Sequence, residues 1–409
     1  MKRCGLLGKT LIHSYSPAIH AMFGNESYRL FETPEEKLAE FLQNGDFDGL
    51  NVTMPYKKAV IPYLSDLSET ALRTGSVNTI TKDETGLHGF NTDYSGFLWM
   101  LADAGIKPQG KKCVILGNGG ASATVQVALA DAGAEKVTVV SHKDNTEETL
   151  RTLADYDILV NTTPVGMFPQ NGESPADLKI FSHLSGVADI VFNPLKTTLI
   201  LQAEAMGIPC AAGLPMLVAQ AKKSAEIFSG EPIPDEKIRF VTGVLKRKEQ
   251  NLVLIGMPGS GKTTIARQLA SRLHRPFFDA DKIVAERAGK SIPEIFSEDG
   301  EDAFRVLESE VLAELGKQNG IVLSTGGGCV TQERNYPLLK QNGVLLLLDR
   351  PLQELATGGR PLSADPQALK KLYESRAPIY RAWADHTFAN ILPPARMAAK
   401  ILTRLGYER

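Results

Sequence analysis

Hydrophobic residues along the chain form short runs that alternate with amphipathic stretches. Runs rich in β-branched and aliphatic residues indicate buried strands at residues 112–117, 136–140, 157–161 and 186–191. Residues 121–132, between the first two runs, have the pattern of a helix, and residues 251–256 begin a further strand that leads into a glycine-rich loop. Strands that alternate with helices predict an α/β fold with parallel sheets.

The length of 409 residues exceeds what one hydrophobic core usually spans. A turn-rich stretch at residues 229–234 is followed by a charged stretch with a helical pattern that ends at residues 246–250, and this shift in composition predicts a boundary near Lys248. We expect a first lobe at 1–100 with a returning segment at 213–245, a second lobe at 101–212, a linker at 246–250 and a separate domain at 251–409.

Composition narrows the possible partners. The formal net charge is −2, so the chain lacks the overall positive charge that would indicate a nucleic-acid partner. The four cysteines form no CxxC pair, which argues against a zinc site. The most apolar stretch, at residues 199–221, contains Glu204 and two prolines, so we expect no membrane span and a cytoplasmic protein. The oligomeric state stays open.

The pattern GxxxxGK[ST] occurs at residues 256–263, directly after a predicted strand. Such loops bind phosphate through backbone N–H groups, while the lysine contacts the β- and γ-phosphates and the hydroxyl binds Mg²⁺. A tight turn without a ligand is the alternative, and the flanking strand and helix argue against it. We predict a nucleotide-binding site that comprises Gly259, Ser260, Gly261, Lys262, Thr263 and Thr264.

Acidic and basic residues beyond this loop are candidates for substrate binding. Asp279 and Asp281 lie on one side of a strand end, because side chains alternate along a strand. One can support Mg²⁺ while the other orients an attacking hydroxyl, although exposed acids are the simpler reading. Arg305 and Glu308 are three residues apart on a predicted helix, a spacing that is also common in surface ion pairs.

Residues 251–406 resemble shikimate kinase, with the motifs in family order, including the glycines at 324–328 and 358–362. The resemblance implies that Asp281 binds the ring hydroxyls, that Asp279 supports Mg²⁺ with Thr263, and that Glu308 steadies Arg305. It implies that Arg305 and Arg376 clamp the substrate carboxylate and that Gly327 lines the ring. It also implies that Arg360 swings in with a lid over the phosphates. The segment before Arg360 is short, and Ala356 stands where an adenine-stacking arginine often occurs.

A second glycine-rich loop at residues 117–123 joins a predicted strand to a predicted helix, as in dinucleotide-binding sites. The next strand ends at Ser141, His142 and Lys143, with no acid at its tip to bind a ribose hydroxyl. These side chains favour the 2′-phosphate of NADP, whereas Asp144 immediately after them counts against it.

Candidate catalytic groups of the first half lie before this loop. Lys57 follows a proline turn at a strand end, and Asp93 lies at a strand-to-helix corner. A lysine beside a carboxylate can protonate a carbonyl oxygen as hydride arrives, although a lone lysine is more often solvated. Ser14 and Ser16 offer hydroxyls to a carboxylate, or cap the helix that follows.

Residues 1–240 resemble shikimate dehydrogenase, on motifs at 14–16, 51–57, 75–79, 91–93, 161–167 and 213–221. The resemblance implies a catalytic Lys57–Asp93 pair. It implies substrate binding by Ser14, Ser16, Thr53, Asn78, Asp93 and Gln220. It implies NADP binding by Gly117, Asn118, Gly119, Gly120, Ala121, Ser141, His142, Lys143, Ile190 and Gly213. Phe192 stands where many members have tyrosine.

Together the resemblances imply a bifunctional enzyme that reduces 3-dehydroshikimate with NADPH and then phosphorylates shikimate with ATP and Mg²⁺. One alternative keeps this chemistry with a different substrate, such as quinate and NAD. Another treats the first half as a ligand-sensing module without turnover, against which the presence of both Lys57 and Asp93 argues.

Overall fold

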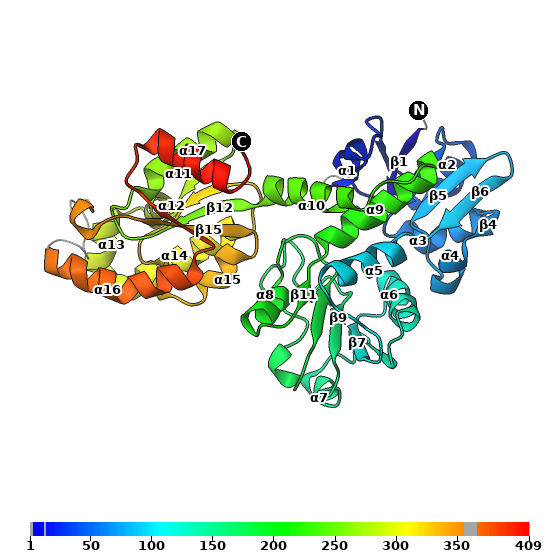
Figure 1. The fold of residues 1–409 in the computed structure, drawn as a ribbon, viewed down its shortest axis with the longest axis horizontal. Coiled ribbons are helices and arrows are strands. Elements are labelled where there is room, and N and C mark those ends of the chain that lie inside the picture. Colours follow the sequence, from blue (N-terminus) through cyan, green and yellow to red (C-terminus); the bar gives the residue numbers. More distant parts are fainter. Residues whose placement is uncertain (1–2, 12–13, 356–365, 409) are drawn as a thin grey trace. The chain divides into compact units, whose positions relative to one another are not determined.

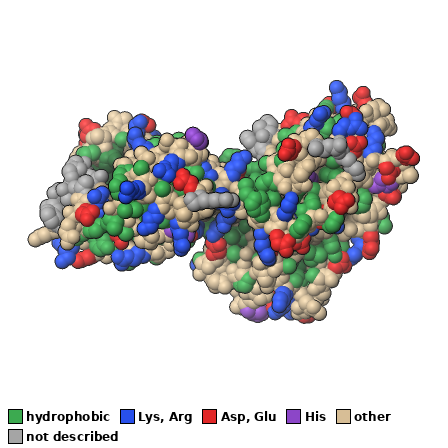
Figure 2. Space-filling model, turned by 45° about the horizontal axis from the view of Figure 1, so that its top comes forward, with side chains coloured by type: hydrophobic (Ala, Val, Ile, Leu, Met, Phe, Trp, Pro, Cys, Tyr) green, Lys and Arg blue, Asp and Glu red, His purple; other side chains and the backbone are tan. Residues whose placement is uncertain are grey.

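The computed structural model describes residues 3–11, 14–355 and 366–408, and the chain divides into two compact units (Figure 1). The first unit comprises Met1–Asn193 and Thr197–Leu245, and the second comprises Pro194–Lys196 and Lys246–Arg409. On the face drawn in Figure 2, acidic and basic side chains are interspersed over both units. Within the described ranges, no helix has the length and apolar character that a membrane crossing requires.

The first lobe of the first unit contains a mixed six-stranded sheet in the order β2-β1-β3-β5-β6-β4. Its strands are β1 (Cys4–Gly8), β2 (Arg29–Glu32), β3 (Gly49–Val52), β4 (Asp66–Leu67), β5 (Thr79–Asp83) and β6 (Gly86–Phe90). Strand β1 pairs in parallel with β2 and β3, whereas β5 runs antiparallel to β3 and β6. Around the sheet lie α1 (Ser16–Met22), α2 (Leu38–Asn44), α3 (Tyr56–Ala59) and α4 (Glu69–Thr74).

The second lobe contains a five-stranded sheet in the order β11-β10-β9-β7-β8, in which every pairing is parallel. The strands are β7 (Lys112–Leu116), β8 (Lys136–Val140), β9 (Ile158–Asn161), β10 (Gly186–Asp189) and β11 (Cys210–Ala211). Alternate residues of β7 enter different cores, because Cys113 and Ile115 pack on one face and Val114 and Leu116 on the other. The predicted strands and the predicted helix after β7 are confirmed; the helix is α6 (Gly120–Asp131).

Two helices join the lobes. Helix α5 (Asp93–Asp103) leads from the first sheet into the second lobe, and α9 (Leu214–Ser229) returns and packs along α5 and α1 (Figure 1). Phe228, near the end of α9, belongs to a buried cluster with Cys4, Leu6 and Tyr28 of the first lobe. Helices α7 (Glu147–Arg151), α8 (Thr198–Ala205) and α10 (Glu236–Glu249) complete the unit.

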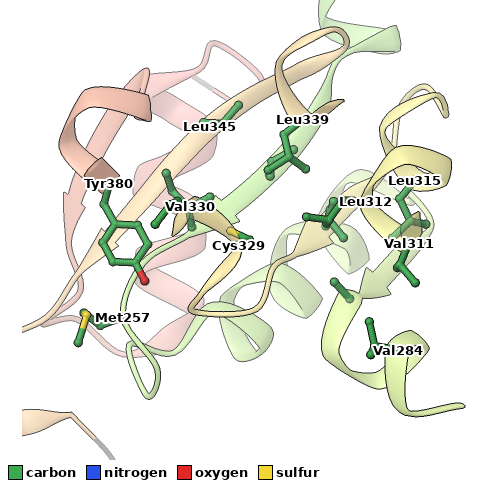
Figure 3. Close-up of a cluster of buried hydrophobic side chains, with 14 of the residues drawn as sticks. Met257, Val284, Val311, Leu312, Leu315, Cys329, Val330, Leu339, Leu345 and Tyr380 are labelled. Carbon is green, nitrogen blue, oxygen red and sulfur yellow. The ribbon is translucent and has the colours of Figure 1, made fainter. Parts of the chain in front are cut away.

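The second unit contains a parallel five-stranded sheet in the order β13-β14-β12-β15-β16. Its strands are β12 (Asn251–Ile255), β13 (Phe277–Asp279), β14 (Val322–Ser324), β15 (Gly343–Asp349) and β16 (His386–Ala389). Helices α11 (Lys262–Leu273) and α17 (Pro394–Arg404) cover one face (Figure 1). The other face carries α12 (Ala280–Ala288), α13 (Ile292–Glu298), α14 (Gly300–Gly316), α15 (Asn335–Lys340) and α16 (Pro366–Trp383). Figure 3 shows the core beneath this face, with Tyr380, Val330 and Cys329 buried together.

The segment expected as a linker, residues 246–250, is helical over most of its length. Residues 246–249 form the last turn of α10, and β12 begins at Asn251. Carbonyl groups at the end of a helix have no partner within the helix, and here Arg275 donates to the carbonyl oxygens of Arg247, Lys248 and Gln250. The boundary between the units therefore lies inside a helix.

Candidate active sites

Lys57 and Asp93 form an ion pair in the first unit. Lys57 lies on α3, just beyond the end of β3, and Asp93 is the first residue of α5. Lys57 Nζ donates to Asp93 Oδ2 at 2.6 Å, and the two side chains are 25% and 12% exposed. The pair is thus partly desolvated yet reachable, as a proton donor to a bound ligand must be.

The second oxygen of Asp93 is held by an amide. Asn78 Nδ2 donates to Asp93 Oδ1 at 2.9 Å and lies 3.4 Å from Gln220 Oε1. Asn78 precedes β5 and Gln220 lies on α9, so the fold brings together residues from widely separated segments. Lys57, Asn78, Asp93 and Gln220, all predicted site residues, therefore lie in one cluster.

A buried layer of hydroxyl groups supports this cluster and was not predicted from the sequence. Ser224 Oγ is within 3.0 Å of the Thr92 Oγ1 and 2.8 Å of the Thr79 Oγ1, and it accepts from Asn51 Nδ2 at 2.8 Å. Thr92 immediately precedes Asp93, and its backbone N–H donates to Asn78 Oδ1 at 2.7 Å. Ser224 lies four residues after Gln220, on the same helix face, and this spacing is the signal that could have indicated it.

Ser14, Ser16 and Thr53 lie at the ends of first-lobe elements. The backbone N–H of Ser16 donates to Ser14 Oγ at 3.2 Å, and α1 begins at Ser16. Thr53 directly follows β3. Between the two serines, the ring of Tyr15 meets Phe192 of the second lobe edge to face, with ring centres 5.7 Å apart. This contact connects the serine segment with the second lobe.

The glycine-rich loop leaves open space at the start of α6. Gly117 has φ of +105°, a conformation that favours glycine, and Gly119 is the N-cap residue of α6. A Cβ on Gly119 would meet no atom within 4 Å, and one on Gly120 would meet only Ser76 Oγ, at 3.9 Å. This open space beside a helix N-terminus fits the pyrophosphate of a dinucleotide.

The other predicted cofactor residues lie beyond the ends of three strands of this sheet, β8, β10 and β11. Ser141 Oγ hydrogen-bonds to the Asp144 carboxylate, while His142 and Lys143 are exposed beyond the end of β8. A Cβ on Gly213 would overlap the carbonyl oxygen of Ile190, so these two predicted residues are in direct contact. Exposed basic side chains at this strand end fit a 2′-phosphate.

In the second unit, the phosphate-binding loop runs from β12 into α11. Lys262 is buried and Nζ donates to the carbonyl oxygens of Gly256 at 2.9 Å and Met257 at 3.0 Å. Thr263 Oγ1 donates to Asp279 Oδ2 at 2.7 Å. The described residues contain no cluster of three or more acidic, histidine or cysteine ligands. A single carboxylate beside a hydroxyl fits Mg²⁺, which keeps several waters and takes its other ligands from phosphates.

The predicted substrate residues of this unit meet around the loop 326–328. A Cβ on Gly326 would lie 2.5 Å from Asp281 Oδ1 and would overlap Glu308, and a Cβ on Gly328 would overlap the Arg305 guanidinium. Arg376 Nη1 donates to the Gly327 carbonyl at 3.1 Å. Arg305 and Arg376 therefore converge near Asp281, at a cavity of about 740 Å³ that Gly259, Gly261, Lys262, Thr263 and Thr264 also line.

Arg305 is held between two carboxylates. It donates to Glu308 at 2.7 Å and to Glu301, which the sequence did not indicate, at 2.8 Å. Burial raises the pKa of the Glu308 carboxyl, and the charge of Arg305 opposes this rise.

Of the predicted ATP-binding residues, Ser260 does not line the cavity. Its side chain is buried, and its carbonyl oxygen accepts from Asn390 Nδ2 at 2.6 Å. Arg360 lies outside the described residues.

Comparisons with known proteins place the two units in different families. The family model "Shikimate dehydrogenase substrate binding domain" matches residues 6–80, and the model "Shikimate kinase" matches residues 258–406. A shikimate dehydrogenase (NADP(+)) of Clostridium beijerinckii is 36% identical over 248 residues, which cover 56% of this chain and 92% of that protein. One from Methanopyrus kandleri is 36% identical over 269 residues, covering 58% and 92% respectively.

Solved structures agree with the sequence relatives. A chorismate mutase/shikimate 5-dehydrogenase fusion protein from Clostridium acetobutylicum has a TM-score of 0.58 and 35% identity, covering 61% of this chain and 98% of that one. A shikimate 5-dehydrogenase from Thermus thermophilus, solved with NADP(H) and shikimate, has a TM-score of 0.54 and 33% identity, covering 59% and 98%. The chain therefore belongs to the shikimate dehydrogenase family through its first unit and carries a shikimate kinase domain in its second.

Proposed function

We propose that the two sites act in sequence on one cyclic carboxylic acid. The first unit reduces 3-dehydroshikimate to shikimate with NADPH, and the second transfers a phosphoryl group from ATP to shikimate. The observation that carries the proposal is that each nucleotide-binding loop belongs to a unit with the polar groups its reaction needs: the Lys57–Asp93 pair in one, and Asp281 with Arg305 and Arg376 in the other.

In the first unit, bound NADPH would supply hydride to the ring carbonyl carbon. Lys57 donates a proton from Nζ to the carbonyl oxygen as the hydroxyl forms, and then regains a proton from solvent. Asp93 orients Lys57 Nζ toward the ligand, while Asn78 fixes the carboxylate from its other side. Gln220, Thr53, Ser14 and Ser16 would hold the substrate's hydroxyl and carboxylate groups.

The cofactor would lie along the ends of the second-lobe strands. Backbone N–H groups of Asn118, Gly119, Gly120 and Ala121 would bind the pyrophosphate, because the start of α6 carries partial positive charge. Ser141, His142 and Lys143 would bind the 2′-phosphate. Ile190 and Gly213 would support the nicotinamide end.

In the second unit, ATP with Mg²⁺ supplies the phosphoryl group. Asp281 accepts the proton of the attacking hydroxyl, and Arg305 and Arg376 bind the substrate carboxylate in a fork geometry that suits planar anions. Lys262 exchanges its two backbone carbonyl partners for the phosphates. Thr263 and Asp279 would hold the metal ion, and Gly327 would let the ring approach the backbone.

A coupled assay on the full-length chain tests the proposal. With 3-dehydroshikimate, NADPH, ATP and Mg²⁺ supplied together, NADPH absorbance should fall and ADP should appear. Lys57→Ala should abolish NADPH oxidation and leave phosphorylation of added shikimate nearly unchanged, whereas Lys262→Ala should have the opposite effect. Loss of both activities in either variant would contradict two independent sites, and faster turnover with quinate and NAD would contradict the substrate assignment.

A further inference from the structure

The cavity of the second unit is lined by an arginine that the proposed mechanism does not use. Arg350 lines the same cavity as Gly259, Lys262 and Thr263. Among the charged residues of the cavity lining, lysines and arginines outnumber acids by five to two. This excess of positive charge suits a polyanion such as a nucleoside triphosphate, because the cations repel one another until an anion joins them.

The fold fixes the backbone at Arg350 beside the phosphate-binding loop. Arg350 directly follows β15, whose Leu347 pairs with Ile255 of β12, immediately before the loop. Asn390 connects the same two segments: its backbone N–H donates to the Asp349 carbonyl at 2.7 Å, and Nδ2 donates to the Ser260 carbonyl at 2.6 Å. Asn390 therefore links Asp349, the residue before Arg350, to the phosphate-binding loop.

The side chain of Arg350 is loosely held. Its one ion pair among the described residues joins Nε to Glu354 Oε2 at 3.4 Å, and these side chains are 36% and 49% exposed. Nε is buried and makes no hydrogen bond within the described part of the chain. A long, half-exposed ion pair contributes little free energy, so the guanidinium can leave Glu354 for a stronger anion at small cost.

We propose that Arg350 is a nucleotide-binding residue that contacts the phosphates of ATP from the β15 side of the loop, opposite the side where Asp281 and Arg305 bind the ring acid. Glu354 holds the guanidinium near the cavity when no nucleotide is bound and competes with the phosphates for it. The inference rests on the proposed kinase activity and adds a phosphate contact to it. Its ligand class is a nucleoside di- or triphosphate.

The test compares nucleotide binding by full-length variants. Arg350→Gln should raise the Kd for ADP and the KM for ATP about tenfold, as expected for loss of one charge-assisted hydrogen-bonded contact. The Kd for adenosine, which has no phosphate, should stay within about twofold, and so should the KM for shikimate and the dehydrogenase rate. Arg350→Lys should recover part of the loss, and Glu354→Gln should tighten ADP binding about twofold.

Arg381→Gln is the matched control. Arg381 lies on α16, is exposed, and donates to Tyr373 away from the cavity lining, so its removal should leave ADP binding unchanged. Equal weakening of adenosine and ADP by Arg350→Gln would show a merely structural role and overturn the inference. Unchanged ADP binding in Arg350→Gln, with weakened binding in Lys262→Ala, would overturn the role of Arg350 and leave the kinase proposal standing. Unchanged ADP binding in both variants would overturn the nucleotide site itself.

Discussion

Gly96 of α5 lies directly against Gln220 of α9. A Cβ on Gly96 would come within 2.9 Å of the Gln220 Cβ and 2.8 Å of the Met216 carbonyl oxygen. The helix carrying Asp93 and the helix carrying Gln220 therefore touch backbone to backbone, three residues beyond Asp93. The absent side chain at residue 96 permits the close approach of the two helices that carry Asp93 and Gln220, both residues of the proposed substrate site.

Gly96→Ala should separate these helices. We expect an overpacking cost of about 1–3 kcal/mol in the free energy of unfolding of the first unit and at least a tenfold fall in kcat/KM for 3-dehydroshikimate. Each unit holds one of the two tryptophans, Trp99 and Trp383, so fluorescence in a Trp383→Phe background reports on the first unit alone. Ala102→Ser, an exposed change on the same helix, is the control; equal effects of both changes would argue against the helix contact.

Gly119→Ala should weaken cofactor binding without weakening the fold. Gly119 has φ of −79°, which alanine adopts freely, and the new methyl group would meet no protein atom within 4 Å. The methyl group would instead occupy the space assigned to the pyrophosphate, so the KM for NADPH should rise about tenfold or more. Initial rates against NADPH concentration measure this. An unchanged KM would show that the phosphates lie elsewhere.

Gly328→Ala should impair the second site selectively. Its φ of −102° imposes no strain, but a Cβ there would overlap the guanidinium of Arg305, which Glu301 and Glu308 hold in place. A displaced arginine loses its fork geometry toward a carboxylate, so the KM for shikimate should rise about tenfold or more. ADP binding and the dehydrogenase rate, measured on the same chain, serve as controls and should not change.

Asp189 should make the first unit less stable as the pH rises. This carboxyl is fully buried at the end of β10, and burial raises its pKa from 3.8 to about 6, against hydrogen bonds from Thr197, Asn161 and the Val191 amide. Because the folded state holds a proton that the unfolded state has released, the stabilisation is complete below about pH 4 and is lost as the pH rises through 6.

Asp189→Asn removes this titration. Relative to the variant, the natural chain should lose up to about 3 kcal/mol of unfolding free energy between pH 4 and pH 7. Urea denaturation of both proteins in the Trp383→Phe background, followed by Trp99 fluorescence at several pH values, measures the difference. If the free energies of unfolding of the two proteins change in parallel with pH, Asp189 is ionised in the folded state throughout this range, and the prediction is wrong.

Local patterns in the sequence were sufficient for the nucleotide loops and the strands that precede them. Residues 112–116 and 251–255 are short, mostly apolar runs that are each followed directly by a glycine, and each is a buried strand that leads into a helix. The residues of such a motif are consecutive, so the order of residue types along the chain is enough to predict the strand, loop and helix. Lys57 and Asp93 are 36 residues apart, and their pairing was expected from family resemblance rather than from spacing.

Residues that support the sites were missed because their roles depend on tertiary contacts. Ser224, Thr79 and Thr92 are ordinary hydroxyl residues until three elements bring them within hydrogen-bonding distance. Glu301 lies one helical turn before Arg305, and together with Glu308 it accepts hydrogen bonds from the Arg305 guanidinium. The charged helical stretch that the sequence predicts to end at residues 246–250 corresponds to α10, which ends at Glu249, so most of the segment expected as a linker is the last turn of that helix.

The cap that Arg275 provides for the end of α10 affects how the chain can be cut. A kinase fragment that starts at Asn251, where its first strand begins, would deprive this guanidinium of all three carbonyl acceptors and the Tyr407 hydroxyl of its Arg247 partner. A fragment that retains the preceding helical turn keeps those acceptors. A fragment boundary that separates the two units without removing these contacts therefore lies upstream of β12, within α10.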